Sequence, residues 1–482
     1  MVTGKCPGCF PTDGTRPKES RGTAFHNREN DMRKIRAGFV GFGEVNTPRE
    51  IIERKCGESR RLLEEAGLEL SATAPVRDDP AGAEVARACA ELARADFDML
   101  ILCVAGWIPS HAVIAVADAF RHKPMVLWGL AGWAEGGRFI TTAGQAGTTA
   151  LRKPMKDLGY TFKYVVSLRS EPEPVPAILR YAEAARAAAL LRGARIGMMG
   201  YRDMNLYGTL HDGVSLRAAI GPEVEVFEML EMDQAVAALK PADVKALAAD
   251  TLKRWTFVKA PKAGTIENSV RLYLALKAKV RERGYQAISL KDVDGVKKLM
   301  GFAPAGVFML LHEHDDICTV PENDVLGAVT QLMVRGTTGQ AAAYMEFYDF
   351  LRNGVLMGVP DYVPSEIVDG PVRVMPTAFG EFGEGLLNVS AVKTGRVTIA
   401  RLTHTGGRYA MHIVGGQAGA PSDWEEAGWT PPAPHLPSLE IALDEPIADF
   451  AEKVLSQHYI LSYGDNREAL RDLCGILKIE LL

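Results

Sequence analysis

The sequence contains no hydrophobic run long enough to cross a membrane, and several well-known catalytic signatures are missing from it. Its most apolar stretch, MLILCVAGWI, is shorter than the about 18 residues a spanning helix needs and is typical of a buried strand. The N-terminus lacks the apolar core of a signal peptide, so we expect a cytoplasmic protein without a membrane partner. A GxSxG elbow, a Walker motif and a zinc HExxH motif are absent, which argues against the enzyme classes built on them.

The chain also lacks an excess of basic residues and a set of cysteines with zinc spacing. Its formal net charge is −5 and no basic run carries interleaved aromatics, which argues against a nucleic-acid partner. The 7 cysteines are scattered, as expected of reduced thiols. Cys6 and Cys9 form a CxxC, but no second pair follows, so a metal or redox role is the less favoured interpretation.

What the sequence does contain is enough apolar material for a large core. Of its 482 residues, 47% are hydrophobic and 24% charged, and the length indicates about three domains. We expect residues 1–32 to be a disordered extension, upstream of a protein that could itself begin at Met32. The other predicted domains are an N-terminal α/β domain over 33–172, a second α/β domain over 173–354 and a β-rich C-terminal domain over 355–482.

Strand and helix patterns alternate along most of the chain. Amphipathic helices are predicted over 48–67, 241–255 and 267–284, and apolar strands over 97–105 and 286–290. The predicted fold class is therefore α/β, with two Rossmann-like, doubly wound parallel-sheet domains. Short β-branched runs broken by Gly and Pro follow, which predicts a mainly antiparallel, barrel-like C-terminal domain. GFVGFGEV is not a complete dinucleotide fingerprint, because Asn46 occupies its third glycine position.

One stretch, CTVPENDVLGAVTQLMVRGTTGQAAAYMEFYDF over residues 318–350, combines a turn, a helix and a strand. PEND is predicted to be a turn that caps a helix over 325–333, and Arg335-Gly336 is interpreted as its stop signal. Glu322 then precedes a helix N-terminus, and Glu346 lies in an otherwise apolar strand. Two such carboxylates are able to share a divalent cation or divide acid and base roles. A capping Glu and a solvent-facing strand-end Glu is the other interpretation of the same spacing.

Two segments resemble a known family. ENDVLGAV followed by YMEFYDF is similar to the metal-binding segment of the L-fucose and L-arabinose isomerases, and VLSQHYILSYGD is similar to the segment carrying their metal histidine. The resemblance covers essentially everything after residue 34. It implies a Mn²⁺ site (or Co²⁺ or Mg²⁺) formed by Glu322, Glu346 and His458, with the two glutamates as base and acid. It further implies interconversion of a free aldose and its ketose through a cis-enediol, in a homotrimer or homohexamer.

The resemblance also implies residues that hold the sugar. Trp107 would reach the site of a neighbouring subunit, Met204 would lie at the first strand-to-helix turn of the second domain, and Gln457 would bind sugar hydroxyls. Trp429 matches a substrate-stacking tryptophan, although core packing explains each aromatic residue equally well.

The chain departs from the family at several positions. A further metal histidine of the arabinose isomerases is missing from LMGVPDYVP, where Asp361 is the nearest residue able to bind a cation or a hydroxyl; a turn-forming role explains Asp361 equally well. Lys291 and Arg202 would make the pocket more positive, as an acidic tail on the sugar would require, or they are ordinary surface cations. HEHDD, residues 312–316, is interpreted as a solvated polar linker on a loop rather than a metal cluster.

Two other functions fit the same residues. A catalytically silent sugar-binding or sensor protein is favoured by the missing histidine and disfavoured by the triad, which a mere binder does not need. A metal-dependent carbon–carbon lyase acting through the same enediolate is the third possibility. The sequence does not choose among candidate sugars.

Overall fold

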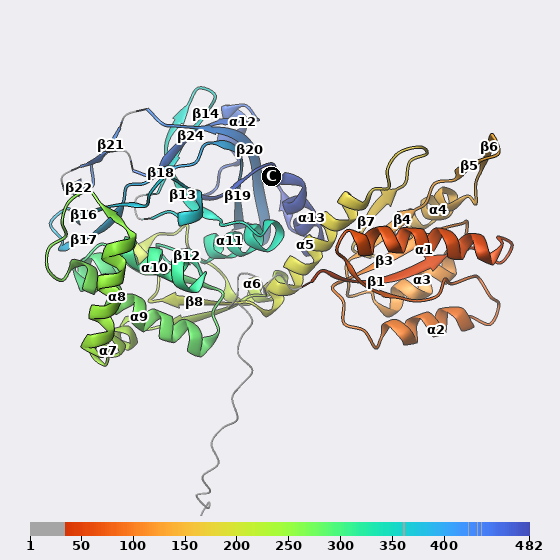
Figure 1. Cartoon of the computed structure of the whole chain (residues 1–482), viewed down its shortest axis with the longest axis horizontal. Coiled ribbons are helices and arrows are strands. Elements are labelled where there is room, and N and C mark those ends of the chain that lie inside the picture. Colours follow the sequence, from red (N-terminus) through yellow and green to blue (C-terminus); the bar gives the residue numbers. More distant parts are fainter. Residues whose placement is uncertain (1–33, 360–361, 423, 431, 435) are drawn as a thin grey trace, which may run out of the picture. The chain divides into compact units, whose positions relative to one another are not determined.

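The computed structural model describes residues 34–359, 362–422, 424–430, 432–434 and 436–482. The predicted N-terminal extension, its CxxC and Asp361 lie outside these residues, so their predictions stay untested. Over the described residues the chain is a mixed α/β protein with two parallel sheets and a closed antiparallel barrel (Figure 1). This architecture confirms the predicted α/β class and the antiparallel character of the C-terminal region.

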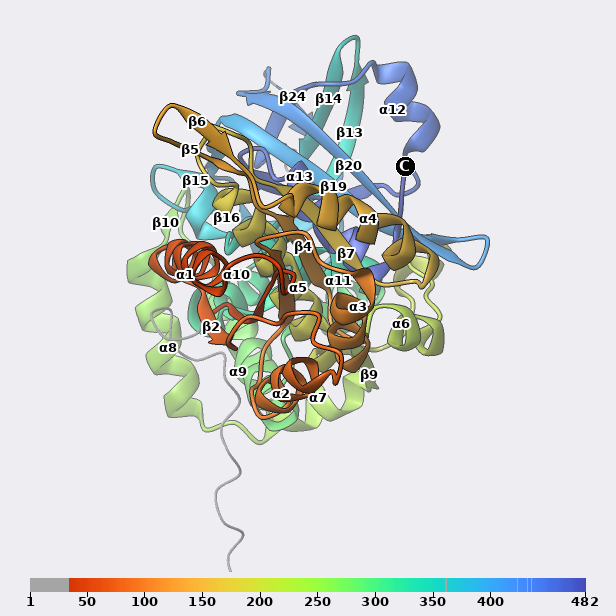
Figure 2. The ribbon, with the colours of Figure 1, turned by 90° about the vertical axis from the view of Figure 1, so that its right-hand side faces the viewer.

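The first parallel sheet has the strand order β2-β1-β3-β4-β7. Helices α1 and α5 pack on one face, against Phe39 and Ile101, whereas α2, α3 and α4 pack on the other, against Val40 and Leu102 (Figure 2). Both faces are therefore covered, which explains why the central strands are apolar throughout. The elements of this region are β1 (Arg36–Phe42), α1 (Arg49–Glu65), β2 (Glu69–Ala72), α2 (Ala83–Leu92), β3 (Met99–Val104), α3 (Ser110–Ala119), β4 (Met125–Gly129), β5 (Trp133–Glu135), β6 (Arg138–Ile140), α4 (Gly144–Asp157), β7 (Phe162–Val166) and α5 (Val175–Gly193).

The second parallel sheet has the order β12-β11-β8-β9. Taken in chain order, its first strand lies between the second and the third, as in the first sheet, so the two sheets share this part of their topology. Its elements are β8 (Arg195–Met199), the 3₁₀ turn η1 (Asp203–Asn205), α6 (Gly213–Ala219), β9 (Glu223–Phe227), α7 (Met229–Ala237), α8 (Pro241–Arg254), α9 (Thr265–Arg283), β11 (Ala287–Leu290), the π-helix η2 (Asp292–Met300), α10 (Ala305–Asp315), β12 (Cys318–Val320) and α11 (Val325–Thr338).

The barrel consists of six antiparallel strands in the order β19-β25-β13-β14-β24-β20, and it closes because β20 pairs back onto β19. Met345 and Tyr459 point into its core, whereas Tyr344 and Ile460 pack outward with residues of α11. The barrel elements are β13 (Ala343–Leu351), β14 (Gly354–Gly358), β19 (Gly395–Thr405), β20 (Arg408–Gly419), β24 (Ser438–Leu443) and β25 (His458–Tyr463).

Smaller elements surround the barrel and complete the chain. A four-stranded sheet joins β10, β16 and β17, with β22 paired to β16, and β26 runs parallel to β20. These elements are β10 (Thr256–Phe257), η3 (Ser365–Ile367), β15 (Val368–Asp369), β16 (Arg373–Phe379), β17 (Glu384–Asn388), β18 (Ala391–Val392), β21 (Glu425–Glu426), β22 (Trp429–Thr430), β23 (Ala433–Pro434), α12 (Ile447–Lys453), α13 (Arg467–Leu477) and β26 (Glu480–Leu481).

The predicted stop of helix α11 at Arg335-Gly336 is wrong. The helix continues to Thr338 and ends at Gly339, whose φ of 67° is the left-handed C-cap that glycine favours. Gly336 has a packing role instead, because a Cβ at this position would lie 3.1 Å from the Cβ of Ala187 on α5. The missing side chain lets α5 and α11 approach closely.

We expect Gly336→Leu to lower the free energy of unfolding by about 1–3 kcal/mol, because it forces extra methylene groups between two packed helices. Gly475→Leu is the matched control, since Gly475 lies inside α13 with no atom within 4 Å of its would-be Cβ. Urea unfolding of both variants checks the prediction, and equal stability of the two would contradict it.

The interpretation of HEHDD as a solvated loop is also wrong. His312 to Asp315 form the last turn of α10, and the side chains of His312 and Asp315 are buried. Each residue of this run has its own partner: His312 bonds Glu366, Glu313 accepts from Trp255, His314 bonds Arg254, Asp315 accepts from Tyr273, and Asp316 pairs with Arg335. The cluster therefore ties helices together.

Candidate functional site

The candidate site lies where the second parallel sheet ends. β8, β11 and β12 are neighbouring parallel strands, so their carboxyl ends meet at one edge. Chain order reverses between β8 and β11, and ligands of open α/β sheets bind in the crevice at such a point. Arg202 and Met204 follow β8, Lys291 follows β11, and Glu322 follows β12. Four of the predicted site residues are thereby placed on adjacent loops.

The turn that carries Glu322 has an unusual backbone. Glu322 and Asn323 are consecutive non-glycine residues with left-handed φ angles of 62° and 54°. Such a conformation costs about 1–3 kcal/mol per residue and persists only where surrounding contacts impose it. Here the N–H of Glu322 donates to Asp292 Oδ1 at 2.7 Å, and the N–H of Asn323 donates to the carbonyl of Leu290 at 3.1 Å. Strain of this kind is typical of functional sites.

Carboxylates also join the other two loops. Asp203, after β8, accepts the backbone N–H groups of Val293 and Asp294 at 2.8 and 2.7 Å. In return, Asp294 Oδ2 accepts the N–H of Met204 at 2.8 Å. The turn containing Met204 and the start of the π-helix η2 are therefore joined by reciprocal hydrogen bonds. Asp292, in the same π-helix, accepts the N–H of Glu322.

The other half of the site comes from the outer face of the barrel. Glu346 on β13 lies directly opposite His458, the first residue of β25. Because the N–H of Phe347 donates to the carbonyl of Gln457, this is a non-hydrogen-bonded pair, in which side chains on the same face have Cβ atoms about 4.5–5.5 Å apart. His458 is thus the first residue of a strand.

His458 and Glu322 approach each other across the two halves. His458 Nδ1 lies 3.8 Å from Glu322 Oε2, and the ring of Tyr344 stacks on the imidazole with centroids 4.3 Å apart. Burial lowers the pKa of His458 to about 3, against the opposing effect of the Asp324 carboxylate. The imidazole is therefore neutral at pH 7 and keeps a lone pair for a cation or a proton.

A buried ion pair supports this arrangement from behind. Asp324 caps α11 by accepting the N–H of Gly327 at 2.9 Å, and it also accepts bonds from Arg401 at 2.5 and 2.9 Å and from Tyr344 at 2.8 Å. Burial alone would raise the pKa of Asp324, but the Arg401 guanidinium holds it below its usual value. Loop, helix and barrel are thereby fixed together directly beside His458.

Two further predicted residues, Gln457 and Trp429, are linked to Glu322, the first directly and the second through other side chains. Gln457 Nε2 donates to Glu322 Oε2 at 3.0 Å. Trp429 is 2% exposed, and the ammonium of Lys297 lies 5.7 Å from its ring centroid. Lys297 in turn pairs with Asp292 at 3.4 Å, the residue that accepts the Glu322 N–H. Trp429 is thus connected to the site through a cation, and its ring is packed in the core.

The predicted cations and Trp107 are placed differently. Lys291 Nζ donates to the carbonyls of Tyr201 and Arg202 at 3.2 and 3.3 Å. Arg202 donates to Asn205 at 3.1 Å. Both residues therefore already stabilise the turn after β8. Trp107 is 40% exposed and follows β3, at the carboxyl edge of the first sheet.

The donor set fits a divalent cation in its chemistry. Two carboxylates and a neutral imidazole suit a borderline ion such as Mn²⁺. Glu322 and His458 already face each other, and Glu346 lies beside His458. Among the residues that the structure describes, no three His, Cys, Asp or Glu side chains are gathered closely enough to hold a metal ion.

Sequence reasoning missed the residues that support the site. Asp203 and Asp292 share a signal, since both come shortly after apolar strands whose carboxyl ends form the site edge. Arg401 interrupts the apolar run of β19, and a buried arginine in such a run implies an ion-pair partner. No feature of the sequence marked Asn323 as a residue that supports the site.

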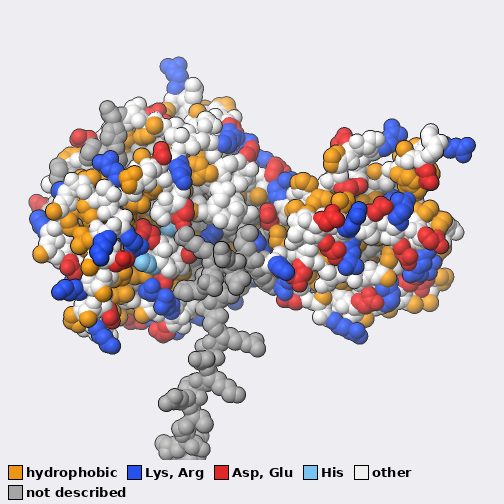
Figure 3. Space-filling model, viewed as in Figure 1, with side chains coloured by type: hydrophobic (Ala, Val, Ile, Leu, Met, Phe, Trp, Pro, Cys, Tyr) orange, Lys and Arg blue, Asp and Glu red, His pale blue; other side chains and the backbone are white. Residues whose placement is uncertain are grey.

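The surface adds two observations. Basic and acidic side chains are interspersed on the face shown in Figure 3, consistent with a net charge of −5. Within the described part of the chain, no helix is long and apolar enough to span a membrane.

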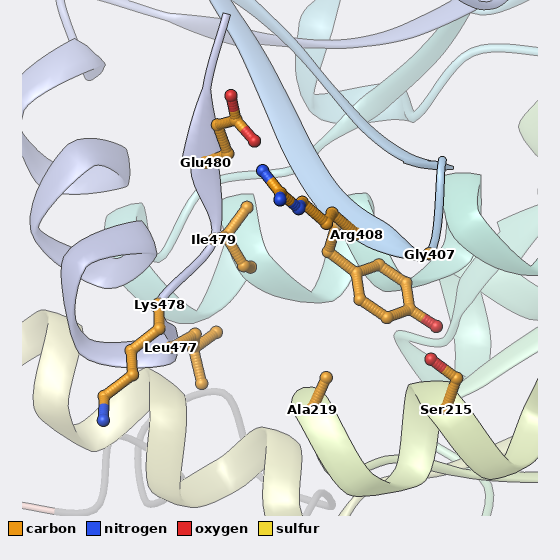
Figure 4. Close-up of a pocket in the computed structure, with 9 residues that line it drawn as sticks. Ser215, Ala219, Gly407, Arg408, Leu477, Lys478, Ile479 and Glu480 are labelled. Atoms are coloured by element: carbon orange, nitrogen blue, oxygen red, sulfur yellow. The ribbon is translucent and has the colours of Figure 1, made fainter.

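A separate cavity of about 260 Å³ lies between α6, the β19–β20 turn and the C-terminal segment (Figure 4). Its lining includes Ser215, Tyr409 and Ile479, and none of the predicted site residues. It is therefore distinct from the candidate site.

Comparisons with known proteins do not identify the chain. No family model matches it, and no curated protein matches it. Among solved structures, it is weakly similar to an ABC transporter solute-binding protein from Burkholderia multivorans, with 9% identity over 64% of this chain and 95% of that chain, and a TM-score of 0.17. A periplasmic sugar-binding protein from Legionella pneumophila gives 11% identity, coverage of 64% and 97%, and a TM-score of 0.16. TM-scores this low support no conclusion about fold or function.

Proposed function

We propose that this protein is a divalent-metal-dependent aldose–ketose isomerase, with Glu322, Glu346 and His458 as its metal and proton-transfer residues. The observation that carries the proposal is the approach of His458 Nδ1 to within 3.8 Å of Glu322 Oε2, with Glu346 opposite His458. The loop after β12 and the barrel thereby bring one carboxylate towards a neutral imidazole, and strand pairing sets the second carboxylate opposite that imidazole. The proposed layout is two Rossmann-like domains followed by the barrel domain.

These residues suit the proton transfers of the reaction. Converting an aldose to its 2-ketose requires a proton to leave C2 and a proton to reach C1. The hydroxyl proton also moves from O2 to O1, and the intermediate is a cis-enediol. One carboxylate removes the first proton and the other delivers the second, and both lie at half-buried positions. A bound Mn²⁺ would supply Lewis-acid stabilisation of the negative charge that develops on the sugar oxygens. Gln457 orients Glu322 by donating to its carboxylate.

The experiment that tests the proposal is turnover of a panel of aldoses and ketoses with Mn²⁺ in D₂O, with product analysis by NMR. Deuterium at C2 of the aldose or C1 of the ketose supports carboxylate-mediated proton transfer. Turnover without solvent exchange would indicate a hydride shift, cleavage products would indicate the enediolate lyase, and binding without turnover would indicate the silent sugar-binding protein.

His458→Ala should reduce Mn²⁺ occupancy strongly, because it removes one of three protein ligands. The ion should also leave the wild type on treatment with EDTA, since open positions would be filled by water or sugar. Metal analysis after dialysis measures both effects. His122→Ala, at an exposed position, is the control and should keep wild-type occupancy. Unchanged occupancy in His458→Ala would rule out this ligand.

Trp107 leads to a prediction about assembly. If it completes the site of a neighbouring subunit, the protein is a closed symmetric oligomer, trimer or hexamer, and Trp107→Ala subunits are inactive. Mixed oligomers of Trp107→Ala and Glu322→Gln subunits should then regain activity, because some sites receive both intact residues. Light scattering checks the mass. An active monomer, or no complementation between the two variants, would contradict the role of Trp107.

A further inference from the structure

Asn323 bonds the ends of two strands beside the candidate site, one through its side chain and the other through its backbone. Its Nδ2 donates to the carbonyl of Met199 at 3.0 Å, and its backbone N–H donates to the carbonyl of Leu290 at 3.1 Å. Met199 and Leu290 are the last residues of β8 and β11, the strands between which chain order reverses. At 1% exposure, Asn323 is shielded from water, so water does not replace these bonds.

The chemistry of this contact requires an amide. A carbonyl oxygen only accepts hydrogen bonds, so the group that faces Met199 must be the NH₂ of Asn323. The substitution Asn323→Asp keeps the size of the side chain but places an ionised oxygen against the Met199 carbonyl oxygen, which removes the bond and adds repulsion. The Oδ1 of Asn323 is buried and has no hydrogen-bond partner among the described residues. The hydrogen bond of this side chain is therefore the one that its NH₂ donates to Met199.

The same residue shares the left-handed backbone with Glu322. Asn adopts a positive φ more readily than most residues, whereas Glu does so at greater cost. Glu322 therefore depends on its neighbours to keep its conformation. Asp292 holds its N–H on one side, and the anchored Asn323 fixes the chain on the other.

We infer that Asn323 is a positioning residue for Glu322: its side-chain amide, bonded to the end of β8, keeps the strained turn that presents the Glu322 carboxylate to His458. This rests on the proposed function in so far as Glu322 binds the cation. The affinity for a divalent cation should then depend on Asn323, although Asn323 is not itself a ligand.

The test compares Asn323→Asp, Asn323→Gly and the wild type as full chains. Mn²⁺ affinity is measured by calorimetric titration, and amide hydrogen exchange of a peptide covering residues 320–326 is measured without metal. Asn323→Gly tolerates the left-handed φ but lacks the amide, so it separates strain from anchoring. Both variants should bind Mn²⁺ about 10–100-fold more weakly, as is usual when a residue that orients a ligand is lost. Both should also exchange faster at Glu322.

Asn388→Asp is the matched control, because Asn388 is also fully buried, lies on β17 in a different sheet, and accepts the N–H of Ser390 with its side chain. It should lose stability and keep Mn²⁺ affinity. Wild-type affinity in Asn323→Gly, or equal losses of affinity in Asn388→Asp and Asn323→Asp, would overturn the inference. A wild type that binds no Mn²⁺ would instead overturn the proposed function, and unchanged exchange at Glu322 in both Asn323 variants would then overturn the inference by itself.

Discussion

Replacing Glu322 or Glu346 with glutamine should lower kcat by about 10²–10⁴-fold, the typical cost of losing one positioned general acid or base. Glutamine has nearly the same size and still bonds its neighbours, so the fold should remain intact. Because each glutamate is also a proposed cation ligand, Mn²⁺ affinity should fall as well. Steady-state kinetics at saturating Mn²⁺ separate the loss of the chemical step from the loss of metal.

The control for these variants is Glu58→Gln on the exposed side of α1, where the carboxylate makes only a surface contact with Arg54 at 3.4 Å. Such a pair contributes little, so the kinetics should match the wild type. Solvent deuterium incorporation gives an independent readout, since a variant without its base should also lose exchange at C2. Activity retained within tenfold in both Glu322→Gln and Glu346→Gln would contradict their assignment as acid and base.

Arg401→Met should destabilise the protein by about 3–5 kcal/mol, because it leaves the buried Asp324 carboxylate without its charged partner. Both side chains of this pair are 1% exposed, and Arg401 makes two hydrogen bonds to Asp324. The double variant Asp324→Asn/Arg401→Met should recover part of the loss, since asparagine keeps the helix cap and carries no charge. Thermal and urea unfolding measure the effect.

Arg60→Met is the comparison for this prediction. Arg60 and Glu64 form a surface pair at 2.8 Å on α1, with side chains 49% and 40% exposed. Breaking it should cost at most about 1 kcal/mol. An Arg401→Met variant as stable as Arg60→Met would show that the buried pair does not hold α11 to the barrel. Reduced Mn²⁺ affinity in Arg401→Met would show in addition that the pair keeps His458 in place.

The sequence by itself predicted the features that depend on local patterns. Helix α1 spans Arg49–Glu65 inside the predicted range 48–67, and α11 begins at Val325 after the cap at Asp324, as expected. The strand around Glu346 was also predicted correctly. Periodicity of apolar residues and capping side chains act over a few residues, so they are readable without knowledge of the fold.

The wrong predictions concern residues whose conformation depends on distant partners. Gly336 looked like a helix stop, but its lack of a side chain serves contact with Ala187 on another helix. HEHDD looked like a solvated loop, but His312 is bonded to Glu366, 54 positions later. A local pattern contains no information about such partners, since glycine and charged residues are as common in turns as in packed helices.

The candidate site was decided only by the tertiary structure. From the residues alone, a capping role for Glu322 was the favoured interpretation, and the link to His458 came from resemblance. Gln457 and Glu322 are 135 positions apart and are hydrogen-bonded because the closed barrel brings β25 beside β13 and both against the loop after β12. Strand pairing and burial set that geometry, and they also make His458 neutral by removing it from water. Residue types can be read from the sequence, whereas distances and pKa values arise only once the chain has closed around them.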